Sequence, residues 1–163
     1  MYRLIALVLL AGCVAKSPAP IAGFRDPSTQ IYSNAVLDNA RLDGRWVQVA
    51  EFAAADAPAC KPGGAEINQT ASGLQIRARL CLNGVPTPFN GALRATGPGR
   101  FAAPSGEPWW VIWADVGYRT LVIGTPSGRF GFILNRDGPL PSDRLRAARE
   151  VLEWNGYALA RLR

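Results

Sequence analysis

The sequence predicts an all-β domain, an eight-stranded antiparallel up-and-down barrel with one C-terminal α-helix packed outside it. Residues 73–82 alternate strictly between apolar and polar side chains, which is typical of a strand with one dry face. Residues 109–135 contain three strand-like runs joined by short, turn-rich breaks, which indicates consecutive hairpins. The 17 glycines and 13 prolines fit a chain with many turns. Eight sequential antiparallel strands can close into a barrel that holds one small ligand.

The N-terminus, residues 1–12, predicts an export signal. Arg3 precedes a run of seven apolar residues, which is too short to span a bilayer. The segment Leu10-Ala11-Gly12-Cys13 resembles the lipobox of bacterial lipoproteins, which implies that Cys13 becomes the lipidated first residue of the mature chain, carrying palmitate or similar acyl chains. Val14 in the next position implies sorting to the outer membrane, facing the periplasm. The alternative is an ordinary secretory signal with a chance cysteine.

Residues 13–34 are expected to form a lipidated tether, because prolines recur among small and polar residues. The folded domain is then expected at residues 35–163, where any helix in Ala35–Leu42 is a short lid or plug. A turn at Ala71-Ser72 pairs Ile67 with Ile76 on the dry face of a hairpin. The expected strands are residues 44–52, 64–70, 73–82, 89–96, 99–103, 109–115, 120–124 and 129–135.

A helix is expected after the barrel. Ser142 is a plausible N-cap, Asp143 lies in the first turn, and Gly156 stands at the C′ position. Residues 157–162 are expected to add a final strand. An apolar stripe that packs against the outside of the barrel is formed by Leu145, Ala148, Val151 and Leu152.

Cys60 and Cys81 are expected to form a disulfide in an exported chain. The glycines after Pro62 allow Cys60 to fold back toward Cys81, and closing this loop contributes about 3 kcal/mol in the chain-entropy model. A catalytic cysteine is the alternative, but no neighbouring base is apparent that lowers the thiol pKa.

The composition argues against several functions. Histidine is absent, which removes Ser–His and Cys–His pairs and the commonest metal ligand. No metal site or cofactor is therefore expected. The net charge of +6 comes from arginines spread along the whole chain, so no nucleic-acid partner is expected. An enzyme using carboxylates such as Glu51 or Asp115 is the weakest alternative, because no acid–base pair stands out.

Three motifs in chain order resemble the lipocalins, specifically bacterial outer-membrane lipocalin lipoproteins. Gly44-Arg45-Trp46 resembles the GxW motif of the first strand, Asp115–Arg119 with Tyr118 and Arg119 resembles the second motif, and Phe132–Arg136 resembles the third. The resemblance covers about Leu42 to the C-terminus. It implies that Trp46 lies inside the closed end of the barrel and that Arg136 packs across it, a cation–π contact worth roughly 0.5–2 kcal/mol.

The resemblance also implies which side chains of each strand face the barrel interior. Besides the ligand-binding residues given below, these are Leu134, Thr120, Val122 and Gly124. An apolar lining of this kind suits a fatty acid or lysophospholipid, and implies a role in envelope lipid storage or transport. The alternative is a barrel plugged by its own aromatic side chains, with a structural or protein-interaction role. The expected ligand-binding residues are Ile76, Ala78, Leu80, Phe89, Leu93, Trp109, Val111, Trp113, Phe130 and Phe132.

Overall fold

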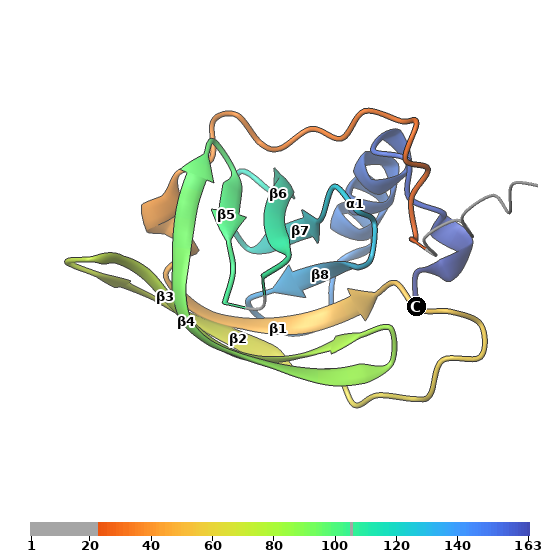
Figure 1. The fold of residues 1–163 in the computed structure, drawn as a ribbon, viewed down its shortest axis with the longest axis horizontal. Coiled ribbons are helices and arrows are strands. Elements are labelled where there is room, and N and C mark those ends of the chain that lie inside the picture. Colours follow the sequence, from red (N-terminus) through yellow and green to blue (C-terminus); the bar gives the residue numbers. More distant parts are fainter. Residues whose placement is uncertain (1–22, 105) are drawn as a thin grey trace, which may run out of the picture.

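The computed structural model describes residues 23–104 and 106–163, and these form a closed antiparallel barrel (Figure 1). Each strand pairs with the next, and β1 pairs with β8, as predicted. The predicted signal peptide and Cys13 lie outside the described residues. The strands are β1 Gly44–Glu51, β2 Gly64–Thr70, β3 Gly73–Leu82, β4 Val85–Gly97, β5 Arg100–Ala102, β6 Pro108–Ala114, β7 Thr120–Gly124 and β8 Gly131–Asn135.

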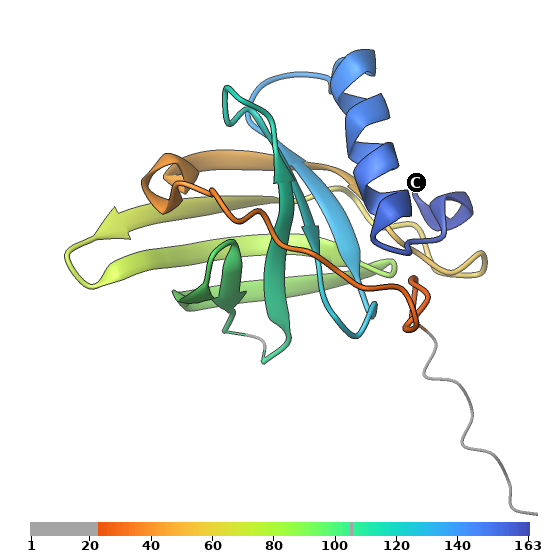
Figure 2. The ribbon, with the colours of Figure 1, turned by 90° about the horizontal axis from the view of Figure 1, so that it is seen from above.

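The hairpin of β2 and β3 has the predicted register, with Ile67 opposite Ile76. Its tip projects from the barrel as a two-stranded ribbon, seen at the left of both ribbon views (Figures 1 and 2). The next strand, β4, begins at Val85 and not at Phe89 as expected. The residues of β4 before Arg94 pair only with β3, because the pairing of β5 with β4 extends no further toward the start of β4 than Arg94. Prolines 86 and 88 are tolerated there because one edge of β4 has no neighbour to receive a backbone N–H.

A β-bulge in β6 overturns the predicted orientation of Trp113. The pairing of β6 with β7 shifts between Val111 and Trp113, so that one extra residue reverses the alternation beyond it. Trp113 therefore faces outward, where it packs against the outer cluster described next. The predicted inward face of β7 is also wrong, although its pairing with β8 has no bulge: Leu121 and Ile123 face inward, whereas Val122 belongs to the outer cluster. Thr120 and Gly124 face outward with Val122, toward Arg144 and Tyr157.

The helix α1, Ser142–Trp154, packs against the outside of the barrel as predicted. Its N-cap residue is Pro141 and not Ser142, and the carbonyl of Pro141 accepts the N–H of Leu145. Leu145 itself is 36% exposed, so it is not part of the packed stripe. In the described part of the chain, no helix is both long and apolar enough to cross a bilayer. The outer cluster consists of Ile31, Phe52, Ile112, Val122, Ile133, Ala148, Leu152 and Tyr157, with partly buried neighbours that include Trp113.

The expected final strand at residues 157–162 is absent. The chain instead forms a 3₁₀ helix at Leu159–Arg161 and makes two isolated bridges, Arg25 with Tyr157 and Phe52 with Leu162. Residues 23–34 were expected in the tether, but they lie against the barrel: Ile31 is buried and the N–H of Asn34 donates to the carbonyl of Val111. In Figure 2 this orange segment crosses the strands toward a second 3₁₀ helix, η1, at Asn39–Leu42.

Candidate functional site: the barrel interior

Arg136 closes one end of the barrel. Its guanidinium carbon lies 4.0 Å from the centre of the Trp46 ring, as the resemblance implied. The same group donates to the carbonyls of Tyr118 (2.8 Å), Arg41 (2.7 Å) and Asp43 (2.7 Å). Burial is the main cause that lowers the pKa of Arg136 below its usual value. The Arg136 side chain thus connects the end of β8 with η1, with the residue before β1 and with the β6–β7 turn.

The backbone around this closure requires particular residues. Gly44 has φ +116°, and a Cβ there would collide with the guanidinium of Arg136. Tyr118 adopts φ +52° in the β6–β7 turn, and its hydroxyl accepts the N–H of Asp38. Arg41 lies 4.0 Å over the Tyr118 ring. The motif glycine and tyrosine therefore serve the closed end and have no contact that marks them as ligand groups.

Asp115 holds the β6–β7 turn together. Its carboxylate accepts the N–H groups of Arg119 and Thr120, both at 2.6 Å, and pairs with the Arg119 side chain at 3.0 Å. Burial raises the pKa of this carboxyl, but the hydrogen bonds and the arginine outweigh burial and hold the pKa below its usual value. Arg119, the last residue of the second motif, is 61% exposed and acts in this turn.

Nine of the ten predicted lining residues lie in one buried cluster inside the barrel, and Trp113 is the exception. Leu134 faces inward with them, as expected. Sequence reasoning missed Phe101, which is 1% exposed, because β5 is only three residues long and gives a weak alternation signal. The nine residues are Ile76, Ala78, Leu80, Phe89, Leu93, Trp109, Val111, Phe130 and Phe132.

Aromatic rings fill the middle of this interior. The Trp109 ring meets Phe89 and Phe132 edge-on, each with ring centres 5.1 Å apart, and Phe130 lies 5.8 Å from Phe132. The four residues are between 0% and 5% exposed, so little of their surface faces solvent or a void. The rings that were expected to line a pocket therefore pack mainly against one another.

One polar group in the interior lacks a partner. The indole Nε1 of Trp109 is buried and donates to no protein acceptor in the described structure. By contrast, the indole N–H of Trp46 donates to the carbonyl of Leu42 at 2.9 Å. Buried donors without an acceptor are uncommon in proteins and costly, so Trp109 offers a hydrogen bond that the chain itself does not use.

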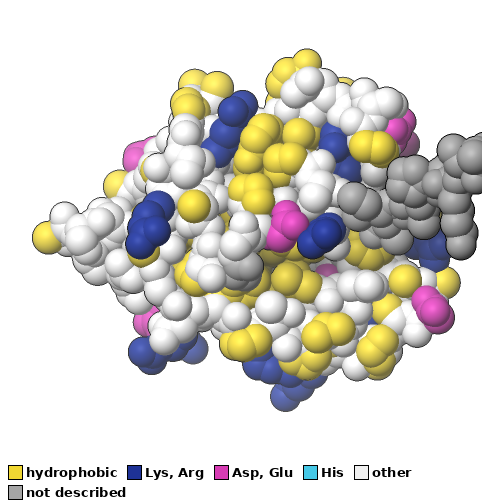
Figure 3. Space-filling view, viewed as in Figure 1, with side chains coloured by type: hydrophobic (Ala, Val, Ile, Leu, Met, Phe, Trp, Pro, Cys, Tyr) yellow, Lys and Arg dark blue, Asp and Glu magenta, His cyan; other side chains and the backbone are white. Residues whose placement is uncertain are grey.

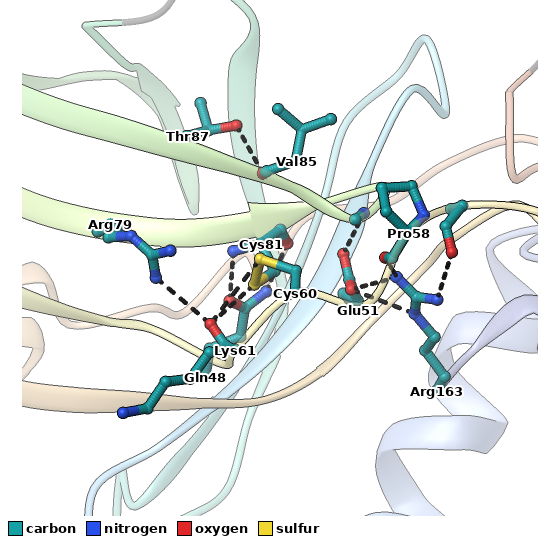
Figure 4. The surroundings of a disulfide bond; sticks show 12 residues. Gln48, Glu51, Pro58, Cys60, Lys61, Arg79, Cys81, Val85, Thr87 and Arg163 are labelled. Atoms are coloured by element: carbon teal, nitrogen blue, oxygen red, sulfur yellow. Dashed lines mark hydrogen bonds and ion pairs between the residues drawn. A yellow bond between two sulfur atoms is a disulfide. The ribbon is translucent and has the colours of Figure 1, made fainter.

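The predicted disulfide between Cys60 and Cys81 is present at the other end of β1, with a Cα–Cα distance of 5.9 Å (Figure 4). Beneath it, the buried Gln48 amide both donates to the carbonyl of Cys81 and accepts its N–H, each at 2.7 Å. Gln48 thus acts as a bridge between β1 and β3, which have no direct pairing in the barrel order. Sequence reasoning missed it because a single buried glutamine has no periodic signature.

The two carboxylates considered for catalysis are both engaged in the fold. Glu51 pairs with Arg163 at 2.9 Å and accepts the N–H of Gly84, and Figure 4 shows Arg163 directed toward Glu51 and Pro58. Asp115 is bound within its turn as described above. Among the described residues, no group of three or more metal-ligating side chains lies together. Figure 3 shows basic side chains scattered among apolar ones on the face it views, without a continuous basic stripe.

The comparisons with known proteins agree with this geometry. A family model described as a lipocalin-like domain matches residues 37–163. The chain belongs to the lipocalin-like family. Lipocalins generally bind small hydrophobic ligands, and they are generally binding or transport proteins and not enzymes. A comparison with curated protein sequences gives no match.

Two solved structures are similar in fold. Insecticyanin from the tobacco hornworm Manduca sexta aligns with a TM-score of 0.62 and 14% identity, covering 86% of this chain and 85% of that one. The major allergen Per a 4 from cockroaches aligns with a TM-score of 0.57 and 13% identity, covering 78% of this chain and 87% of that one. At these identities the likeness supports the fold alone.

Proposed function

We propose that this lipocalin is an envelope lipoprotein that binds a fatty acid or lysophospholipid in its barrel, for storage or transport of lipid. The observation that carries the proposal is an apolar interior with one unused hydrogen-bond donor, the indole Nε1 of Trp109. An acyl chain is held by burial of apolar area, at roughly 25 cal/mol per Å². The oxygen of its carboxylate or ester supplies the acceptor that Trp109 lacks.

Binding of this kind requires the aromatic group to rearrange. Phe130 precedes β8 at the end opposite Arg136, and at 5% it is the most exposed of the four central aromatic residues. We propose that its ring rotates away from Phe132 and admits the ligand at this end of the interior. The cost of separating the rings, about 0.5–1.5 kcal/mol per aromatic pair beyond area burial, lowers the affinity below that of a preformed pocket.

The test is a titration with cis-parinaric acid, a fluorescent fatty acid, combined with native mass spectrometry of the purified protein. We expect saturable binding and a copurifying lipid. Trp109→Phe removes the indole donor and is expected to weaken binding about tenfold, the value of one hydrogen bond to a charged group. Trp113→Phe is the matched control, because it makes the same change on the outer face and should bind like the wild type. Absence of both copurifying lipid and titratable binding contradicts the proposal.

The filled interior supports a second candidate, a plugged barrel that acts through its surface as an envelope or assembly factor. All side chains of the inner cluster are at most 9% exposed, which is the packing of a solid core. In this case the fatty-acid titration gives no signal, and crosslinking in the intact envelope captures a protein partner. The titration therefore separates the two candidates.

The proposal includes attachment to the outer membrane through acyl chains on Cys13, supported by the lipobox-like sequence before it. Metabolic labelling with a palmitate analogue, followed by separation of the two membranes, tests this part. We expect label in the outer-membrane fraction and none in the Cys13→Ser variant. Equal labelling of the variant, or release of the wild type as a soluble protein, contradicts the anchor.

A further inference from the structure

A cavity lies at the end of the barrel that Arg136 closes, beneath the projecting β2–β3 hairpin. It has a volume of about 510 Å³ and is bounded by η1, by the hairpin and by β4 and β5. Cavities that take small organic ligands have about 300–1,000 Å³, so the size is suitable. The proposed fatty-acid site in the barrel interior does not use this cavity.

The floor of the cavity is apolar and belongs to the inner cluster. Leu74, Leu93 and Phe101 line it, and they are 6%, 3% and 1% exposed. The rim is polar and carries the side chains of Gln69 and Gln75. A floor of this kind with a polar rim suits a molecule that has an apolar body and a polar end.

Asn39, the first residue of η1, supplies the specific polar feature of this cavity. Its Oδ1 atom is buried and accepts no hydrogen bond in the described structure. Besides the Trp109 indole in the barrel interior, it is the only such buried side-chain atom among the described residues. The atom has almost no surface open to solvent, so a ligand reaches it only after the Asn39 side chain turns toward the cavity. A buried acceptor without a donor is costly, so a ligand that donates an O–H or N–H group gains by this pairing.

The charges around Asn39 indicate which donor fits. Asp38 precedes it, and the carboxylate of Asp43 accepts the backbone N–H of Gln69 at the rim. Both acids disfavour an anionic group beside Asn39, and an acceptor atom cannot bind a carboxylate directly. Arg94 on β4 also lines the cavity. The polar end of the ligand at Asn39 is therefore a neutral hydroxyl or amide.

We propose that this cavity binds a small neutral amphiphile, such as an aliphatic alcohol or primary amide, whose donor group pairs with Asn39. The site goes beyond the proposed fatty-acid site, from which it differs in position, in access and in the charge of its ligand. Leu74, Leu93 and Phe101 belong both to the inner cluster and to the floor of this cavity.

The experiment is an NMR titration of the amide signals of the protein with 1-octanol and, in parallel, with octanoate. Octanol is expected to shift the signals of Gly73, Gln75 and Ala92 saturably, since these residues line the cavity and lie outside the inner cluster, whereas octanoate binds there at least about tenfold more weakly. Asn39→Leu removes the acceptor and is expected to weaken octanol binding about tenfold.

Two alanine variants test the position of the site. Ala95 is exposed and lines the cavity, so Ala95→Phe is expected to fold and to abolish the octanol shifts. Ala102→Phe is the matched control, because Ala102 is an exposed residue of β5 that does not line the cavity. Any of three results overturns the proposal: octanol still binds to Ala95→Phe, octanol binds to Asn39→Leu as tightly as to the wild type, or octanoate binds as tightly as octanol. Binding of cis-parinaric acid is expected to persist in Ala95→Phe, so the two sites can fail separately.

Discussion

Replacement of Arg136 by alanine should weaken the closed end of the barrel more than any other single change there. The substitution removes the cation–π contact with Trp46 and three hydrogen bonds, to the carbonyls of Tyr118, Arg41 and Asp43. The cation–π contact contributes about 1 kcal/mol at a partly buried site. Each hydrogen bond contributes about 1 kcal/mol, because water can reach the carbonyls once the side chain is gone. We therefore expect the free energy of unfolding to fall by about 3–4 kcal/mol.

Arg136→Lys divides this loss into its parts. A lysine keeps a cation near the Trp46 ring, but its single ammonium group cannot reach three carbonyls on separate segments. We expect this variant to lose about 2 kcal/mol, the contribution of two hydrogen bonds. A double-mutant cycle with Trp46→Leu, which removes the aromatic ring, should give a coupling energy of about 1 kcal/mol for the arginine–tryptophan contact.

Urea unfolding followed by far-UV circular dichroism measures all of these values without depending on the replaced tryptophan. A loss below about 1 kcal/mol in Arg136→Ala would refute the reasoning, since it would leave the three hydrogen bonds without net value. So would an Arg136→Lys variant as unstable as the alanine variant, because the charge over the ring would then contribute nothing.

Two further predictions concern pH. The pKa of Asp115 is lowered in the folded state, so its stabilising effect is present above the unfolded value of about 4 and is lost as the pH falls through the folded value. Asp115→Asn should cost about 1–2 kcal/mol at pH 7 and less at pH 3 in urea unfolding, and an equal cost at both pH values would contradict this. Burial raises the pKa of Tyr157 to about 12, so its stabilising effect is complete below about pH 10 and is lost between pH 10 and 12. Tyr157→Phe should remove this alkaline dependence, and should cost about 1–3 kcal/mol at pH 7 because the N–H of Thr125 loses its buried acceptor. Persistence of the same alkaline loss in Tyr157→Phe would exclude Tyr157 as its cause.

Most of the barrel could be predicted because its strands carry local signals. Alternation over residues 73–82 and the turn at Ala71-Ser72 were sufficient to predict the pairing of Ile67 with Ile76. The closure by Arg136 on Trp46 came from the family resemblance, since residues 90 positions apart in the chain give no local signal of contact. The start of β4 was missed because Pro86 and Pro88 argue against a strand, although the Asn83-Gly84 turn before them, with both φ values positive, is typical of a hairpin.

The orientation of side chains past a bulge could not be predicted from alternation alone. Counting by twos from Val111 puts Trp113 inside the barrel, and the extra residue in β6 puts it outside. In β7 the error has another cause, because its pairing with β8 has no bulge: Val122 was expected inside, and Leu121 and Ile123 are found there. Both faces of β7 are buried, one by the inner cluster and one by α1, so hydrophobicity does not distinguish them.

The size of the space inside the barrel is harder still to predict, because it depends on side chains from every wall at once. Alternation placed Phe89, Trp109, Phe130 and Phe132 in the interior, and each of these residues could line a pocket or fill it. Phe101, Leu121 and Ile123 also belong to the inner cluster and were not expected there, so the interior is fuller than alternation indicated. The Trp109 ring packs against Phe89 and Phe132, and its indole N–H has no acceptor. The unpaired indole N–H destabilises the barrel when no ligand is bound, and a lipid oxygen that accepts a hydrogen bond from it removes this cost. A permanently plugged barrel would be more stable with a well-packed phenylalanine at position 109, because phenylalanine has no donor to satisfy.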